Sequence, residues 1–293
     1  MAKLPFRERL AQGTILADGA MGTMLHARQS LPMDTCFDLL NVTDPAAVAD
    51  IHREYIEAGA EIIETNTFSA NVYKLAECGL EDECADINRR GVELVRRVID
   101  STFRDDVYVA GSVGPLGVRL APFGRVKPEE AFDAFTIQVS ALVNAGVDLL
   151  LFETFTDLSE ITEAIKAART HNPNIPIIAQ MTFTRDNRTV LGDTPAQVAR
   201  TLHDTGADVI GVNCSGGPAQ LLRITQLMHA AVPDAWLSVV PNAGWPELAG
   251  GRVMYPATPD YFGDYALAFQ DAGACVVGGC CGTTPEHIHA MRQ

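Results

Sequence analysis

The sequence has little positive charge. Its 22 lysines and arginines face 37 aspartates and glutamates, so the formal net charge is −15 and the isoelectric point is about 4.8. Such a chain lacks the positive field that would neutralise a nucleic-acid backbone or an anionic membrane surface. We therefore expect neither nucleic acid nor a membrane as a partner.

Long apolar segments are also missing. No run approaches the roughly 20 apolar residues that span a bilayer. Residues 1–9 mix charges of both signs without the apolar block of a secretory signal. This pattern predicts a cytoplasmic protein. The seven cysteines, an odd number spread along a long chain, favour reduced thiols over a disulfide framework.

Linker signals are absent as well. The chain contains no Pro/Ser-rich tract, charge block or low-complexity segment, which predicts one domain over residues 1–293. No Gly-x-Gly-x-x-Gly turn follows the first apolar run, and this weakly disfavours an open doubly wound sheet.

What the sequence does contain is a recurring boundary. Four times an Ala-Gly or Thr-Gly pair precedes a small residue and an apolar run, which indicates a helix, its glycine cap and then a buried strand. With further short apolar runs, eight strands are expected at 15–21, 61–68, 107–114, 148–155, 176–183, 208–214, 236–241 and 275–280. They are apolar without alternation, as strands covered on both faces should be.

Helices fill the intervals. Asp44, Asp157, Thr194 and Thr284 are expected helix N-caps, each followed by a proline or by an acid three residues on. Strand then helix, repeated about eight times, predicts an α/β fold of the single (β/α)₈ TIM-barrel type, with the open sheet as the alternative. Segments 22–43 and 115–127 are expected to be irregular and to lie at strand carboxyl ends, where barrel enzymes place their chemistry.

Three cysteines occur at such strand ends. Cys214 closes the sixth strand, and the glycine-flanked pair Cys280 and Cys281 closes the eighth. Only one strand separates these two, about 10 Å across the sheet, so one ion could take all three sulfurs. Three thiolates with a fourth position free predict a catalytic Zn²⁺ site.

The three thiolate ligands limit the reactions that the predicted zinc site suits. A tris-thiolate zinc site has a net charge of −1 and is a poor generator of hydroxide, but it suits a thiol substrate that it holds as nucleophilic thiolate. The natural reaction is attack of that sulfur on an activated alkyl group. The other cysteines, at 36, 78, 84 and 275, are expected to be small buried hydrophobic residues. His287 and His289 are expected on the solvent side of the last helix.

Six motifs occur in the order found in one family. They are Asp-Gly-Ala-Met-Gly-Thr at 18–23, Glu-Thr-Asn-Thr-Phe at 64–68, Glu-Thr at 153–154, Gly-Val-Asn-Cys at 211–214, Pro-Asn-Ala-Gly at 241–244 and Gly-Gly-Cys-Cys-Gly at 278–282. Together they resemble the zinc-dependent homocysteine S-methyltransferase family, which includes betaine–homocysteine methyltransferase and the homocysteine module of cobalamin-dependent methionine synthase. The resemblance runs roughly from residue 15 to residue 291.

The resemblance implies roles for individual residues. Cys214, Cys280 and Cys281 correspond to the zinc ligands. Asp18 and Glu153 would hold the homocysteine ammonium, and backbone amides at Gly19 and Ala20, with Thr65, would hold its carboxylate. Asn242 is expected at the fourth zinc position when no substrate is bound, although an ordinary turn residue is nearly as good an interpretation.

The implied activity is methyl transfer to the thiol of L-homocysteine, giving L-methionine. The donor stays open among betaine, S-methylmethionine, S-adenosylmethionine and a methyltetrahydrofolate-derived methyl group. Residues 256–262 resemble members fused to a methylenetetrahydrofolate reductase domain, so a fused or associated folate/reductase or cobalamin module is a further expectation. Two other hypotheses remain: an aldolase- or lyase-type barrel without zinc, and a non-catalytic module that binds homocysteine or zinc.

Overall fold

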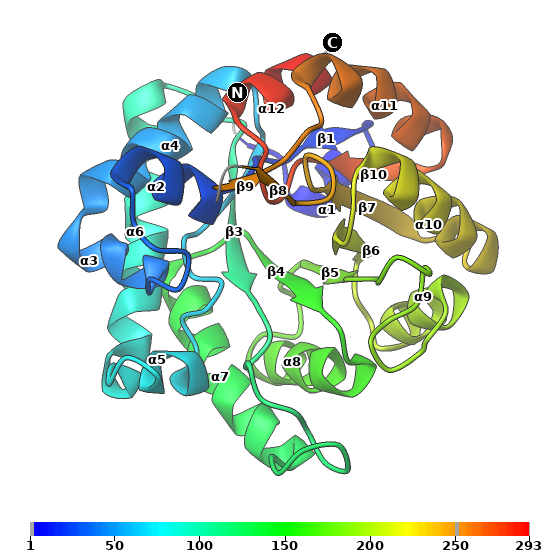
Figure 1. Ribbon diagram of the computed structural model, residues 1–293. Coiled ribbons are helices and arrows are strands. Elements are labelled where there is room, and N and C mark those ends of the chain that lie inside the picture. Colours follow the sequence, from blue (N-terminus) through cyan, green and yellow to red (C-terminus); the bar gives the residue numbers. More distant parts are fainter. Residues whose placement is uncertain (1–2, 250–251, 293) are drawn as a thin grey trace.

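The computed structural model describes residues 3–249 and 252–292. Eight parallel strands pair in the order β1-β10-β7-β6-β5-β4-β3-β2. A parallel bridge between Ala17 and Ile62 joins the two ends of this row, so the sheet closes on itself. Helices surround it on the outside (Figure 1). The predicted TIM barrel is confirmed, and the open sheet is excluded.

All eight expected strands are present. They are β1 (Ile15–Leu16), β2 (Ile62–Glu64), β3 (Tyr108–Val113), β4 (Leu149–Phe155), β5 (Ile177–Met181), β6 (Val209–Cys214), β7 (Trp236–Pro241) and β10 (Ala274–Val277). Most bounds differ from the expected ones by one to three residues, but β1 and β2 are much shorter, with two and three residues where 15–21 and 61–68 were expected. An antiparallel pair, β8 (Glu247–Ala249) and β9 (Arg252–Met254), follows β7 and was not expected from the sequence.

The helices lie before β1, between the strands and after β10. They are α1 (Phe6–Leu10), α2 (Gly22–Gln29), η1 (Phe37–Leu39), α3 (Leu40–Thr43), α4 (Pro45–Ala58), α5 (Val72–Ala76), η2 (Glu81–Glu83), α6 (Cys84–Thr102), α7 (Pro128–Ala145), α8 (Leu158–His171), α9 (Pro195–Asp204), α10 (Pro218–Ala231), α11 (Pro259–Asp271) and α12 (Pro285–Met291). The expected caps stand at α4, α8, α9 and α12. Asp44 and Thr194, for example, each accept a backbone N–H of the first turn.

One expectation about the loops is wrong. Segment 22–43 is not irregular, because it contains α2, η1 and α3. Met24 and Leu25 of α2 are buried against the core, and this burial stabilises a short helix that a weak periodic pattern does not reveal. In segment 115–127 the only pairing is an isolated bridge between Leu120 and Val126.

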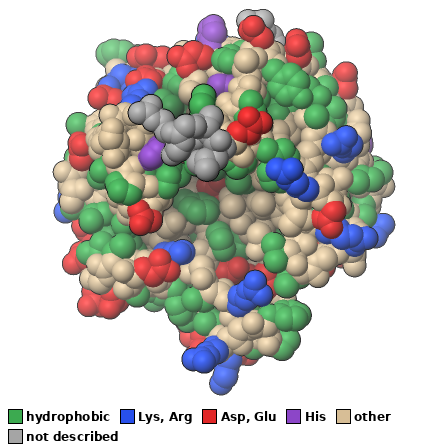
Figure 2. Space-filling view, in the orientation of Figure 1, with side chains coloured by type: hydrophobic (Ala, Val, Ile, Leu, Met, Phe, Trp, Pro, Cys, Tyr) green, Lys and Arg blue, Asp and Glu red, His purple; other side chains and the backbone are tan. Residues whose placement is uncertain are grey.

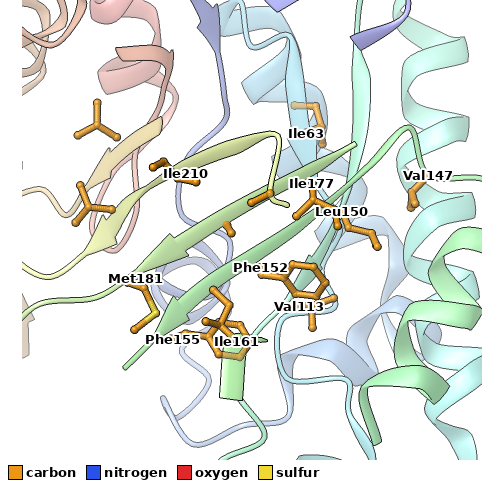
Figure 3. Packing of buried hydrophobic residues seen from close by; sticks show 14 of the residues in the cluster. Ile63, Val113, Val147, Leu150, Phe152, Phe155, Ile161, Ile177, Met181 and Ile210 are labelled. Carbon is orange, nitrogen blue, oxygen red and sulfur yellow. The ribbon is translucent and has the colours of Figure 1, made fainter. Parts of the chain in front are cut away.

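Side chains of each barrel strand alternate between two cores. Leu149 and Leu151 of β4 belong to the inner cluster, whereas Leu150 and Phe152 belong to the larger cluster between strands and helices. Figure 3 shows part of this outer layer, where Phe152 lies close to Val113. The two-residue period therefore fixes which side chains line the barrel interior.

The interior changes character along the barrel axis. Near the amino ends of the strands it is apolar, and α1 covers it with Phe6 and Leu10, whose partners include Tyr108. In the middle, Gln180 donates a hydrogen bond to Ser238. Nearer the carboxyl ends of the strands, the inward positions become polar. They are occupied by Glu64 of β2, Ser112 of β3, Glu153 of β4 and Asn213 of β6.

The carboxyl end of the barrel is the end with the polar interior. Figure 2 views the face that carries the β8–β9 hairpin and shows a hollow near its centre with acidic side chains in it. None of the described helices combines the length and apolar character needed to cross a membrane.

Candidate metal centre and substrate pocket

The three cysteines singled out from the sequence meet at this end. Cys214 is the last residue of β6, while Cys280 and Cys281 follow β10. Their Sγ atoms lie within 4.8 Å of one another, the only such group of three or more His, Cys, Asp or Glu in the described part of the chain. A tetrahedral ion with sulfurs at about 2.3 Å needs them roughly 3.8 Å apart, so small side-chain rotations suffice. The donor set fits a metal ion that prefers soft ligands.

Backbone geometry brings the thiols together. Cys214 has a left-handed backbone with φ +53°, which turns the chain sharply at the strand end. The Cys280 N–H donates to Pro241 O (2.8 Å) and the Ala243 N–H donates to Cys281 O (2.9 Å). These bonds tie the cysteine pair to the end of β7, the strand that separates it from Cys214.

The thiols interact strongly with one another. Hydrogen bonds from Cys280 and Cys281 lower the pKa of Cys214 to about 3, with a smaller contribution from Asn242, although burial opposes the shift. The contact with Cys214 raises the pKa of Cys280 and raises that of Cys281 to about 12. Cys214 is thus favoured as thiolate, the form that binds metals.

Asn242 lies beside this cluster. Its side chain interacts with Cys214, and its Nδ2 is 3.4 Å from Ser215 O. Its Oδ1 is buried and has no hydrogen-bond donor among the described residues. A buried carbonyl oxygen without a partner next to three thiols is chemically suited to a metal ion, which supports the prediction of a fourth ligand.

Tyr255 is a contact that no sequence motif indicates. Its hydroxyl interacts with Cys281, and burial together with the nearby cysteines raises its pKa, which keeps it neutral. Its ring packs on Gly282, where a Cβ would come within 2.2 Å of the ring and where φ is +79°. Tyr255 follows the unexpected β8–β9 hairpin, so its position depends on tertiary structure.

Asp18 and Glu153 are both buried at the same end, 3% and 8% exposed. Asp18 Oδ2 accepts the Glu64 N–H (3.1 Å), but its buried Oδ1 has no partner in the described residues. Glu153 accepts hydrogen bonds from the Ser112 hydroxyl (2.6 Å) and the Asn213 side-chain amide (3.3 Å). Burial raises the pKa of Asp18 well above its usual range and that of Glu153 to about 7. A cation that enters this pocket would stabilise the ionised form of both carboxyl groups and so lower both pKa values.

Glu64 is a third carboxyl group of this pocket, and no role was predicted for its side chain. It ends β2, two residues after the inward-facing Ile62, and its carboxyl group hydrogen-bonds with that of Glu153. Counting in twos along the predicted strand could have placed it inside the barrel.

The residues predicted to hold the substrate carboxylate lie near this pocket, and two of them already have hydrogen-bond partners. The Ala20 N–H donates to Thr283 Oγ1 (3.1 Å), and Gly19 packs so closely on Thr283 and Tyr55 that a Cβ would meet their oxygens at 2.7 and 2.8 Å. The Thr65 hydroxyl contacts that of Thr67 (2.6 Å). The Ala20 amide and the Thr65 hydroxyl would have to exchange partners to bind a substrate, so their roles and that of the Gly19 amide stay predictions.

Two expectations for the remaining cysteines and histidines are wrong. Cys84 is buried as predicted, whereas Cys78 is exposed and Cys36 and Cys275 are half-buried. Cys78 follows the short helix α5, where no core covers it. His287 is buried, because its ring packs edge-on against Phe262 and bonds to Thr284 in the first turn of α12. His289 is exposed, as predicted.

Comparison with known proteins agrees with this arrangement of residues. A family model described as homocysteine S-methyltransferase matches residues 15–293. The chain belongs to the homocysteine S-methyltransferase family. It is 36% identical to the methionine synthase of Mycobacterium leprae over 97% of its length, and 35% identical to that of Mycobacterium tuberculosis over 96%. It spans only 24% of each of these relatives.

Solved structures of this family share the whole fold. The Escherichia coli homocysteine methyltransferase MmuM in its metallated form superposes with a TM-score of 0.83 at 27% identity, covering 99% of both chains. Its apo form superposes with a TM-score of 0.76. The carboxyl transferase domain of Rhizobium etli pyruvate carboxylase, at 16% identity and a TM-score of 0.51, shares the barrel fold alone.

Proposed function

We propose that this barrel transfers a methyl group to the thiol of L-homocysteine, giving L-methionine, and that Cys214, Cys280 and Cys281 hold Zn²⁺ for this reaction. The observation that carries the proposal is the convergence of three thiols within 4.8 Å beside a buried acidic pocket. Family membership and the metallated form of the MmuM homologue support it.

The pocket matches the chemical groups of homocysteine. Asp18 Oδ1 and Glu153 offer acceptors for the substrate ammonium, since a buried ammonium needs carboxylate partners. Bound by the three thiolates, Zn²⁺ would lower the pKa of the substrate thiol and keep it as thiolate at neutral pH. The substrate sulfur then attacks the donor's methyl carbon, the S–CH₃ bond forms, and the donor leaves with the electrons of its bond to that carbon.

The methyl donor is a small molecule or a methyl carrier on another module. Because the chain spans a quarter of the mycobacterial methionine synthases, we include a fused or associated folate/reductase or cobalamin module among the expected partners. Betaine, S-methylmethionine and S-adenosylmethionine are the donors that need no such module.

The zinc assignment is tested by metal content. Purified protein should contain about one equivalent of Zn²⁺, and Cys280→Ala should lose most of it while keeping its circular-dichroism spectrum, because no core residue depends on the ion. Cys84→Ala, which changes a buried thiol outside the site, is the matched control and should keep its zinc. Full occupancy in Cys280→Ala would overturn the assignment.

The reaction is tested with a panel of donors. L-methionine formation from L-homocysteine should be measured with betaine, S-methylmethionine, S-adenosylmethionine and methylcobalamin. At least one donor should support turnover in the wild type and none in Cys280→Ala. A protein that binds no zinc yet turns over an aldolase substrate would support the lyase hypothesis. Tight homocysteine binding without turnover of any donor would support a non-catalytic module.

A further inference from the structure

The acidic pocket holds more carboxyl groups than one ammonium requires. Asp18, Glu64 and Glu153 come from three different strand ends and meet at the top of the barrel interior. Three ionised carboxylates in a buried site would repel one another strongly, because the low local dielectric weakens screening. A substrate ammonium carries one positive charge and can hydrogen-bond with two of them, so a proton retained on the third relieves the remaining repulsion.

Hydrogen-bond donors indicate which carboxyl groups are ionised. The orientation of the Asn213 amide is set by its Oδ1, which accepts the Thr154 N–H (2.8 Å), so its Nδ2 must face Glu153 Oε2. Glu153 Oε1 receives the Ser112 hydroxyl. Both oxygens of Glu153 are therefore acceptors, as in a carboxylate.

Glu64 has a different environment. Within the described residues, no N–H and no hydroxyl donates to its carboxyl group, whose partner is the carboxyl group of Glu153. Two carboxyl groups in hydrogen-bonding contact share a proton, and the one without other donors is the one that carries it. Asp18 is less suited to carry the shared proton, because its Oδ2 accepts the Glu64 N–H and, within the described residues, its Oδ1 contacts no acceptor to which a proton could be donated.

We propose that Glu64 stays protonated and donates a hydrogen bond to Glu153, which positions Glu153 as the ionised carboxylate that receives the homocysteine ammonium. Glu64 is thus a positioning residue that acts through Glu153. This inference rests on the proposed function, because it assumes that the ammonium of homocysteine binds here.

The electrostatics of the pocket agree with this assignment. Burial, followed by the charges of Glu153 and Asp18, raises the pKa of Glu64 well above its usual range. Burial also raises the pKa of Glu153, to about 7, but there the contact with Glu64 opposes the shift. The other titratable groups that face the pair are Asp18, the Tyr55 hydroxyl of α4 and the thiols of Cys214 and Cys281. Burial raises the pKa of Tyr55, so that group stays neutral.

The test compares two substitutions in the zinc-loaded protein. Glu64→Gln keeps a donor for Glu153, whereas Glu64→Leu does not. The Kd for L-homocysteine, measured by calorimetry, should stay within about threefold of wild type in Glu64→Gln and rise at least about tenfold in Glu64→Leu, as expected for loss of a hydrogen bond to a charged group. Zinc content should be unchanged in both.

Two controls separate positioning from general damage. A thiol that lacks the amino group, 4-mercaptobutanoate, should bind the wild type and Glu64→Leu equally. Glu61→Gln, at the other end of the same strand region and paired with Arg9, should leave homocysteine binding unchanged. If Glu64→Leu fails to fold, infrared spectra of wild type and Glu64→Gln test the inference instead. The carbonyl stretch of a protonated carboxyl group should be present in the wild type and absent from Glu64→Gln.

Several results would overturn the inference. Equal damage from Gln and Leu would mean that Glu64 is ionised and contacts the ammonium itself. Equal tolerance of both would mean that Glu64 does not position Glu153, and so would an unchanged infrared band. A wild-type protein that binds no homocysteine would instead refute the proposed function, so the two failures are distinguishable.

Discussion

Single residues at the carboxyl end of the barrel adopt backbone conformations that are rare elsewhere. Thr154, Cys214 and Ser215 all have positive φ, between +53° and +64°. Such residues are uncommon outside glycine and cluster at functional sites, where surrounding structure holds them in place. Here they end β4 and β6, the strands that carry Glu153 and the first thiol. Local strain and substrate chemistry therefore coincide at the same positions.

Glu153 gives the sharpest prediction at this scale. Glu153→Gln keeps the size of the side chain but removes the negative charge that we propose binds the substrate ammonium. A hydrogen bond to a charged group contributes about 1.5–3 kcal/mol, so the Kd for L-homocysteine should rise about 10- to 150-fold. Calorimetry on the zinc-loaded protein measures this directly.

Metal content separates this effect from damage to the site. Glu153→Gln should retain its zinc, because Glu153 bonds to Ser112 and Asn213 and is not among the three thiols. Unchanged homocysteine affinity, or loss of zinc in this variant, would show that Glu153 has another role.

At the scale of helices and strands, helix α8 stabilises the loop that follows β3 through a hydrogen bond. Glu160, in its first turn, is 5% exposed and accepts the Leu116 N–H (2.7 Å). Burial raises its pKa from 4.5 to about 7. A raised carboxyl pKa means that the folded state binds the proton more tightly, so this contribution to stability is complete below about pH 4.5 and is lost as the pH rises to about 7.

Glu160→Gln should remove that pH dependence, because an amide keeps the acceptor for Leu116 without a titratable proton. The free energy of unfolding of the variant should exceed that of wild type by a margin that grows from pH 4.5 to 7 and then levels off, on the order of 3 kcal/mol. Urea unfolding at several pH values measures it. The same substitution at the exposed Glu129 should produce no such trend, and a constant margin at Glu160 would contradict the argument.

At the scale of the whole molecule, the two ends of the barrel have separate tasks. The amino end is a packed core that α1 closes, with Phe6 3% exposed and stacked edge-on against Tyr108 at 5.4 Å. The carboxyl end carries the thiols and carboxyl groups. This division is the usual one for (β/α)₈ barrels, in which stability and chemistry occupy opposite faces.

Phe6→Ala should therefore affect stability and leave the metal site intact. Removing a buried phenylalanine costs about 3–5 kcal/mol, so the urea midpoint should fall clearly while zinc content and homocysteine affinity at 25 °C stay at wild-type values. Phe103→Ala, at a side chain that is 95% exposed, should change stability by less than about 0.5 kcal/mol. Loss of zinc in folded Phe6→Ala would show that the two ends are coupled.

The sequence by itself determined the repeating units and the three cysteines that we propose as metal ligands. Glycine caps before apolar runs mark four of the barrel strands, and short apolar runs alone mark the other four, since both signals depend on neighbouring residues. The same local reasoning failed for α2 and for His287, because their burial depends on contacts with distant parts of the chain. It also said nothing of the β8–β9 hairpin, which places Tyr255 beside the cysteines.

Only the tertiary structure decided which side chains meet. The pairing of β6 and β10 on either side of β7 brings Cys214 to Cys280 across 66 residues of sequence, as the expected strand order implied. The register of β2 to β4 brings the Glu64 carboxyl group to that of Glu153, which the sequence did not indicate. The carboxyl contact does not follow from composition or spacing, because a parallel strand's neighbours lie a helix or more away along the chain. The physical reason is that periodicity along one strand specifies which way a side chain points, while closure and register specify what it points at.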